Sequence, residues 1–346
     1  MKYAIVMTAL VMALSLPVKA LEITAPTVPD YASEYMPSDP VNLTEGILEV
    51  LRTAINRARP DIREAGRVCI SLAAIMMLLS VFRTFPGTSD RTVNLSGAVC
   101  LSTVMLNSAT ALMNLAADTV KAISEYGKML LPPMTAALAA QGGITSSTAL
   151  YAGTVMFDAF LSSLISKLLI PMTYVYLAVS TVASATSEDM LSKFRDTVKW
   201  MITWVLKTVL YVFTGYIGIT GILSGTTDAA ALKAAKLTIS GVVPVVGGIL
   251  SDASEAILVS AGSAKNAAGI YGLFAMIALL CGPFLKIGVH YLMVRFTGMI
   301  CSIFGSKSLS GLIQDFASCM GMMLGMTGAV SMMFLISVMC FMKGVG

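Results

Sequence analysis

The feature that most constrains this chain is a set of long apolar runs. The last run, from Cys319 to Met342, has no charged residue and is rich in methionine and glycine. About 20 apolar residues suffice for a helix to cross the hydrocarbon core of a bilayer. We expect Asn266–Phe304 to form two helices, divided near Gly282–Lys286, and six to eight membrane-embedded segments in all. The runs are Val68–Phe82, Leu95–Ala117, Thr154–Ala183, Val198–Leu223, Asn266–Phe304 and Cys319–Met342.

Composition supports a membrane protein built from helices. Of the 346 residues, 56% are hydrophobic and 12% are charged, whereas a soluble domain is about 25% charged. Only helices and closed barrels satisfy the backbone in lipid, and the alternating strand pattern of a barrel is missing from the sequence. The net charge of +4 is spread out, without the basic stripe of a nucleic-acid-binding protein. The predicted fold class is therefore all-α, a polytopic helical membrane protein.

The first twenty residues have the layout of an export signal. Lys2 precedes an apolar stretch from Ala4 to Leu16, and Val18-Lys19-Ala20 forms a small-x-small cleavage site. We therefore expect residues 1–20 to be a signal peptide and the mature chain to begin at Leu21. The alternative is an uncleaved first membrane helix.

Residues 21–67 are predicted to be exported, as a Pro-rich tether followed by a basic amphipathic helix over 44–67, in which Pro60 causes an interruption or starts a second piece. Apolar side chains recur there at helical spacing, and the arginines fall largely on the other face. Such a helix lies on lipid headgroups or docks a partner helix, and the sequence allows either. Basic residues favour the cytoplasmic side, so a reversed orientation stays open. The remaining residues, 68–346, form the multi-span membrane domain.

Two stretches share a layout that favours an internal repeat of about 112 residues, between 68–183 and 198–304. One stretch begins at Leu130 and the other at Gly241, and each contains a proline followed by paired glycines. Pro133 and Pro244 are 111 residues apart, and a further pair, Pro171 and Pro283, is 112 residues apart. Such paired breaks are typical of transport proteins with a central site, although proline and glycine are common in membrane helices generally. The C-terminal span 319–342 follows the second copy. The predicted hairpin breaks are Pro133, Gly142, Gly143, Pro244, Gly247 and Gly248.

The stretch from 240 to 272 is small and apolar but carries charges. Asp252 is predicted to be a helix N-cap, with Glu255 completing a capping box, and Lys265 and Asn266 ending that short helix. We expect a hairpin of two helical pieces, either re-entrant or interfacial. The acids serve as caps alone, or they line a pore or contact a partner, because ionisable residues within membrane segments are functional candidates.

Two further charges interrupt apolar runs. Lys207 shares a predicted helix face with Trp204 and Tyr211, and Asp158 is its candidate partner. Catalytic motifs are missing: the sequence has no spaced histidine cluster, no nucleophile elbow and no phosphate-binding loop. The six cysteines show no metal-binding spacing. We therefore expect no enzyme, no metal site and no cofactor.

The block "VVPVVGGILSDASEAILVSAGSAKNAAGIYG" resembles the most characteristic block of the stage III sporulation protein AE family. The block "LLPPMTAALAAQGGITSSTALY" resembles that family's other recurrent block. The resemblance implies a subunit of the secretion-like complex that links mother cell and forespore during engulfment, in the mother-cell-derived membrane around the forespore. The implied partners are the other proteins of the stage III sporulation A operon and, across the intermembrane space, stage II sporulation protein Q.

The sequence leaves two function classes open. The first is a membrane subunit of that channel complex, required for late forespore development, in which this chain could also form a homo-oligomer. The second is a stand-alone secondary transporter, favoured by the predicted breaks and the charges within apolar runs. Membrane lipid is a partner in both cases, and nucleic acid in neither.

Overall fold

A computed structural model describes the chain over residues 26–37, 43–87, 89–141, 143–186, 188–242, 247–304 and 306–343. Within these ranges, side chains are described everywhere except at 43–44, 220–267 and 304. The predicted signal peptide, with its cleavage site after Ala20, lies outside the described residues, as do Gly142 and Pro244. The division into an exported segment and a membrane domain stays a prediction.

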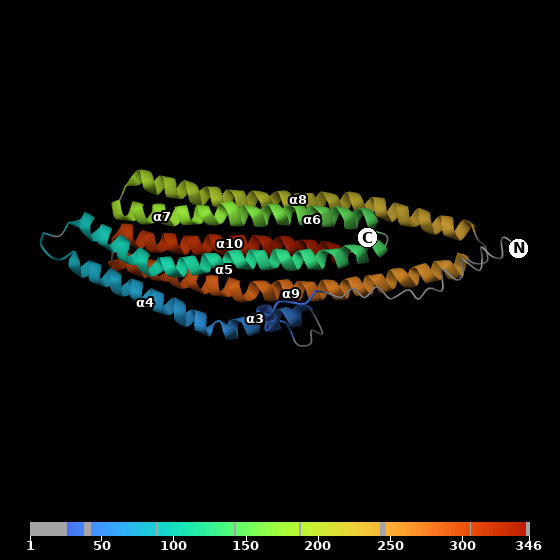
Figure 1. The fold of residues 1–346 in the computed structure, drawn as a ribbon, viewed down its shortest axis with the longest axis horizontal. Coiled ribbons are helices and arrows are strands. Elements are labelled where there is room, and N and C mark those ends of the chain that lie inside the picture. The colour runs from blue at the N-terminus through green and yellow to red at the C-terminus, as the bar shows by residue number, and fades with distance from the viewer. Residues whose placement is uncertain are drawn as a thin grey trace.

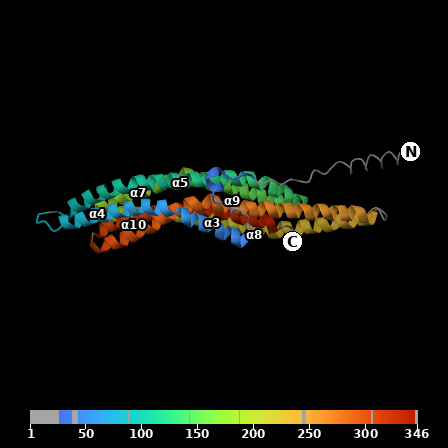
Figure 2. The ribbon, with the colours of Figure 1, turned by 90° about the horizontal axis from the view of Figure 1, so that it is seen from below.

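The described residues form helices and contain no strand. The helices run up and down in an elongated antiparallel bundle (Figures 1 and 2). Their bounds are α2 Asp30–Ser33, α3 Leu43–Arg57, α4 Arg59–Phe82, α5 Asp90–Ala140, α6 Ile144–Leu164, the π-helical turn η1 Ile165–Leu169, α7 Ile170–Thr186, α8 Asp189–Val242, α9 Gly247–Phe304 and α10 Lys307–Lys343.

Six helical segments of the described chain are long and apolar enough to cross a membrane, which confirms the all-α polytopic class. They are Arg59–Phe82, Asp90–Ala140, Ile144–Thr186, Asp189–Ile219, Ala268–Ile303 and Lys307–Lys343. The longest helix, α9, has 58 residues and is therefore about 87 Å long. Because the hydrocarbon core is only about 30 Å thick, the longest helices extend beyond it.

The predicted division of Asn266–Phe304 into two helices is wrong. Pro283 lies inside α9, which passes through it without a break. Gly282 beside it meets Tyr35 of the N-terminal segment, 3.1 Å from the position a Cβ would occupy. Proline is tolerated in membrane helices where neighbouring groups satisfy the freed backbone. These residues therefore mark a contact with the N-terminal segment and not a turn.

The predicted hairpin break at Pro133 is also wrong. Pro132 and Pro133 both lie inside α5, and the chain turns only before Gly143, which directly precedes α6. The prolines leave the carbonyls of Lys128 and Met129 without helical donors, and both of these residues are exposed. The repeat was predicted from matching breaks at Pro133 and Pro244, and the break at Pro133 does not occur. The repeat itself stays a prediction.

Pro171 has a different effect on its helix. It is the second residue of α7 and directly follows the π-helical turn η1. Because proline has no N–H, it cannot bond the carbonyl of Lys167, and a wider π turn relieves the clash with its ring. Lys167 is exposed on this turn.

The core of the bundle is built around α10. This helix packs against α5, α6, α7, α8 and α9, and its side chains Phe316, Phe334 and Phe341 are completely buried. Glycines on the neighbours allow this close packing: a Cβ at Gly127 of α5 would lie 2.0 Å from the Phe334 ring. Between helices in lipid, such packing replaces the hydrophobic effect as the main attraction.

These contacts predict a difference between two glycine substitutions. Gly127→Ala should destabilise the bundle by about 1–3 kcal/mol, because the buried Phe334 ring has no free space to move into. Gly311→Ala in α10, where a Cβ meets nothing within 4 Å, should be neutral or stabilising. Thermal unfolding of both variants in the same detergent measures this, and equal midpoints would contradict the packing.

Candidate functional site

The four candidate residues of the 240–272 stretch all lie within one helix. α9 begins at Gly247 and passes without interruption through Asp252, Glu255, Lys265 and Asn266. The prediction that Asp252 is an N-cap is therefore wrong, as is the short helix ending at Lys265 and Asn266. α8 ends at Val242 and α9 begins with Gly247 and Gly248, so this predicted hairpin break coincides with a helix boundary. The side chains of all these residues lie outside the described part, so no contact is assigned to them.

The backbone nevertheless places this stretch at one end of the molecule. Gly269 of α9 lies against Met342, next to the last residue of α10. Asp252 is 17 residues before Gly269, which is about 25 Å further along the helix. The paired ends of α8 and α9 continue beyond α5, α6 and α10 (Figures 1 and 2). We call this part, residues 225–242 and 247–265, the projecting hairpin.

Asp158 lies in the core of the bundle. Its side chain is 1% exposed on α6, and Ser124 of α5 donates a hydrogen bond of 2.6 Å to its Oδ2. The other oxygen, Oδ1, is buried without a hydrogen-bond partner in the described part of the chain. One turn away, the hydroxyls of Thr154 and Ser337 are 2.8 Å apart and link α6 to α10. A buried carboxylate that is only half satisfied is costly, which keeps Asp158 a functional candidate.

Lys207 lies on the outside of α8, and its predicted ion pair with Asp158 does not form. Among the described residues, none of the ion pairs includes Lys207. Trp204 and Tyr211 are exposed beside it, as the helical spacing predicts, with Tyr211 73% exposed. These side chains face lipid, water or another protein.

A charged cluster that the sequence did not predict joins three helices. Asp315 of α10 is only 13% exposed, and Arg195 of α8 donates to its Oδ2 over 2.8 Å. Tyr176 of α7 donates to its Oδ1 over 3.0 Å. A polar hollow of about 620 Å³ lies beside this cluster, next to the α7–α8 and α9–α10 turns. The cluster fixes the relative positions of the three helices at that end.

A second cluster joins α9 to α4. Lys286 Nζ lies 3.0 Å from Glu64 Oε2 and 3.5 Å from Asp61 Oδ1. One turn along α9, the buried His290 bonds the Lys286 carbonyl through Nδ1, over 2.9 Å. In the sequence, Lys286 stands out only as one end of the predicted division at Gly282–Lys286. The structure pairs it with acids of the basic amphipathic region, more than 200 residues away.

The amphipathic region itself folds back onto the bundle. Val50 and Ala54 of α3 are buried against α9, while Leu48 and Ile55 are each about 60% exposed. Arg57 at the end of α3 pairs with Glu34. One side of α3 is thus used within the molecule, and its exposed apolar side is free for lipid or a partner.

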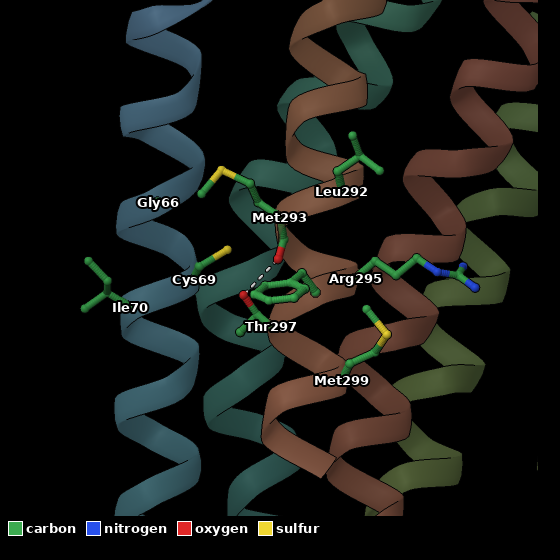
Figure 3. A pocket seen from close by; sticks show the side chains of 9 residues that line it. Gly66, Cys69, Ile70, Leu292, Met293, Arg295, Thr297 and Met299 are labelled. Atoms are coloured by element: carbon green, nitrogen blue, oxygen red, sulfur yellow. Dashed lines mark hydrogen bonds between the residues drawn. The ribbon is translucent and has the colours of Figure 1, made fainter. Parts of the chain in front are cut away.

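An apolar groove of about 660 Å³ runs between α4 and α9 (Figure 3). Ile70, Leu292 and Phe296 line it, and the Thr297 hydroxyl is already bonded to the Met293 carbonyl over 2.8 Å. Arg295 points away from α4, as Figure 3 shows. An active site needs convergent polar groups, and this groove lacks them. Its lining suits lipid chains.

The described clusters serve to hold helices together. None of them groups three residues that could bind a metal ion. Each charged residue in them is bonded to a partner on another helix, so the arrangement stabilises a bundle. The features directed outward include the projecting hairpin, the exposed apolar side of α3 and the exposed face of α8 around Lys207.

The bond to Asp158 predicts the effect of two substitutions. Ser124→Ala should cost about 1–3 kcal/mol, because it leaves both carboxyl oxygens buried and unpaired. Asp158→Asn should unfold at or above the wild-type temperature, because its amide oxygen still accepts from Ser124 and no charge is buried. Thermal unfolding checks both, with the exposed Ser71→Ala as control. A strongly destabilised Asp158→Asn would show that the structure requires the charge.

The three-helix cluster predicts a strong effect of Arg195→Met. It leaves the nearly buried Asp315 without its cation, at a cost of about 3 kcal/mol, the low end for buried pairs because both groups retain some exposure. Lys121→Met is the matched control, because its pair with Glu125 is exposed and worth less than about 0.5 kcal/mol. Similar unfolding midpoints for the two variants would contradict the assigned role of Arg195.

Comparison with known proteins agrees with this architecture. A family model described as stage III sporulation protein AE matches residues 41–344. The stage III sporulation protein AE of Bacillus subtilis (strain 168) is 25% identical over 183 residues, which are 53% of this chain and 46% of that relative. The match thus spans about half the length of the relative. No solved structure matches. The chain belongs to the stage III sporulation protein AE family.

Proposed function

We propose that this sporulation protein is a membrane subunit of a secretion-like channel complex between mother cell and forespore. It would reside in the mother-cell-derived membrane around the forespore and be required for late forespore development. Its partners would be the other proteins of the stage III sporulation A operon and stage II sporulation protein Q across the intermembrane space. Family membership and six apolar helices support the broader role, a multi-pass membrane protein in sporulation.

The observation that carries the proposal is the projecting hairpin. It extends about 25 Å beyond α10 at Asp252, where its two helices continue past the ends of α5, α6 and α10 (Figure 1). The stretch carries Asp252, Glu255 and Lys265, which are suited to binding polar partner surfaces. A subunit of a larger assembly uses it to contact a neighbour.

The alternative, a stand-alone secondary transporter, loses its main argument. Carrier sites of this kind are built from broken helices near the bilayer midplane. α5 passes through Pro132 and Pro133, and α9 passes through Pro283, without a break. The predicted Lys207–Asp158 pair, which would have lined such a site, is also missing.

Two measurements with the purified full chain separate these functions. A subunit should co-purify from sporulating cells with its operon neighbours and should catalyse no solute uptake when reconstituted alone in liposomes. Uptake by the protein alone, without those neighbours, would favour the transporter and contradict the proposal.

Substitutions in the projecting hairpin test whether its charges contact a partner. Asp252→Asn and Glu255→Gln keep the size and helical position of the side chains but remove the negative charge. We expect both, and the double variant most, to reduce sporulation at least tenfold with normal protein levels in the membrane. Sporulation efficiency and immunoblot abundance are measured together. Wild-type sporulation in the double variant would exclude a charge-dependent contact.

A further inference from the structure

The exposed face of α8 carries a regular stripe of side chains. Six exposed residues follow one another at alternating intervals of three and four, the pattern of a 3.5-residue period: Thr197, Trp200, Trp204, Lys207, Tyr211 and Thr214. The Trp200 and Trp204 rings stack on each other, 6.0 Å apart, instead of inserting into the bundle. A 3.5-residue period is the spacing at which one helix packs along another. We call this the α8 stripe.

A second stripe with the same spacing lies on α5. Its exposed residues are Ala111, Asn114, Asp118, Lys121, Glu125 and Lys128. Lys121 and Glu125 lie 3.9 Å apart and satisfy each other in part. Asp118 forms no ion pair with any described residue. Tyr31 borders this stripe, and burial together with the nearby carboxylates of Asp118 and Glu125 raises the pKa of its phenol.

Asp118 and Lys207 lie at the same depth in the bundle. Ser124 of α5 bonds Asp158 of α6, and the preceding residue of α6, Phe157, contacts Phe213 of α8 with ring centroids 5.4 Å apart. Ser124 and Phe213 therefore lie at about the same height along the bundle axis. Asp118 precedes Ser124 by six residues, and Lys207 precedes Phe213 by six, about 9 Å in each case. α5 and α8 run in the same direction in the antiparallel order of the helices (Figure 1).

The stripes cannot meet within one molecule. α6, α7 and α10 lie between α5 and α8 in Figure 1, and both stripes consist of exposed residues. A lysine or aspartate facing lipid without a partner is strongly unfavourable, so Lys207 and Asp118 each need a partner of opposite charge. In a membrane, copies of one protein are related by rotation about the membrane normal. Such a rotation leaves the depth of every residue unchanged, so residues of equal depth in two copies can meet. The α5 stripe of one copy then meets the α8 stripe of the next, head to tail.

We propose that a second copy of this chain docks its α5 stripe on the α8 stripe, pairing Asp118 of one copy with Lys207 of the next. The argument rests on the charge complementarity, the common 3.5-residue spacing and the matched depth of the two stripes. It does not depend on the channel function, because it concerns contacts between copies of this chain alone. A head-to-tail contact of this kind closes into a ring when its rotation divides a full turn.

Disulfide crosslinking in membranes tests the contact directly. Two tagged full-length chains are co-expressed, one with Asp118→Cys and one with Lys207→Cys, both with the exposed native Cys100 replaced by serine. We expect a mixed crosslinked dimer. The control pairs Asp118→Cys with Phe194→Cys, which is exposed on α8 but about 20 Å away from the level of Lys207, and should give no crosslink. Equal crosslinking of both pairs, or of neither, would overturn the proposal.

Charge reversal provides an independent measurement on the purified full chain in lipid nanodiscs, without other sporulation proteins. Lys207→Glu or Asp118→Lys alone should lower the oligomer fraction at least tenfold, and the two together in one chain should restore it. Lys307→Glu, an exposed reversal on α10, should leave it unchanged. A monomeric wild type, or no restoration in the double variant, would sink the idea. Crosslinking of position 207 only to a different membrane protein would assign the α8 stripe to that protein instead.

Discussion

Close approach of helices at glycines is the contact on which this bundle depends. Lipid chains are as apolar as leucine, so burying an apolar side chain between two membrane helices gains little over leaving it in lipid. What remains is van der Waals packing, and packing requires backbones to come near each other. The Phe334 ring of α10 reaches α5 because residue 127 has no side chain, and the Tyr216 ring of α8 reaches α6 at Gly153 in the same way. Leu130 of α5 meets α9 at Gly272.

Hydrogen bonds and ion pairs between polar groups then fix the relative positions of helices that packing alone would leave free to slide. The Ser124–Asp158 bond fixes α5 against α6, and Arg195 with Tyr176 fixes α8 and α7 against Asp315 of α10. These bonds are few, but each one sets the sliding position of a helix pair, because one helical turn of slippage would break it. The same bonds place the α5 and α8 stripes at a common level. The core polar contacts thus determine what the outer surface can recognise.

The sequence was sufficient for the class of the fold but not for the arrangement of its helices. Composition and run length predicted an all-α membrane protein, and helical spacing placed Trp204, Lys207 and Tyr211 on one face. The sequence could not show whether that face points into the bundle or out of it, because the core and the lipid-facing surface of a membrane protein are both apolar. Proline was ambiguous for a related reason: α5 and α9 tolerate Pro133 and Pro283 in unbroken helices, whereas a soluble helix would kink or end there. The Arg195–Asp315 pair joins residues 120 positions apart and leaves no periodic signal.

Two kinds of contact surface follow from this architecture, and they point in perpendicular directions. The α5 and α8 stripes face sideways from the bundle, where a second copy of the chain can reach them. The projecting hairpin extends along the bundle axis, where a partner outside the bilayer can reach it (Figure 1). A lateral contact sets the number of copies, and an axial contact connects those copies to proteins beyond the membrane. α8 carries both the stripe and half of the projecting hairpin, so the lateral and the axial contact surfaces meet in one helix.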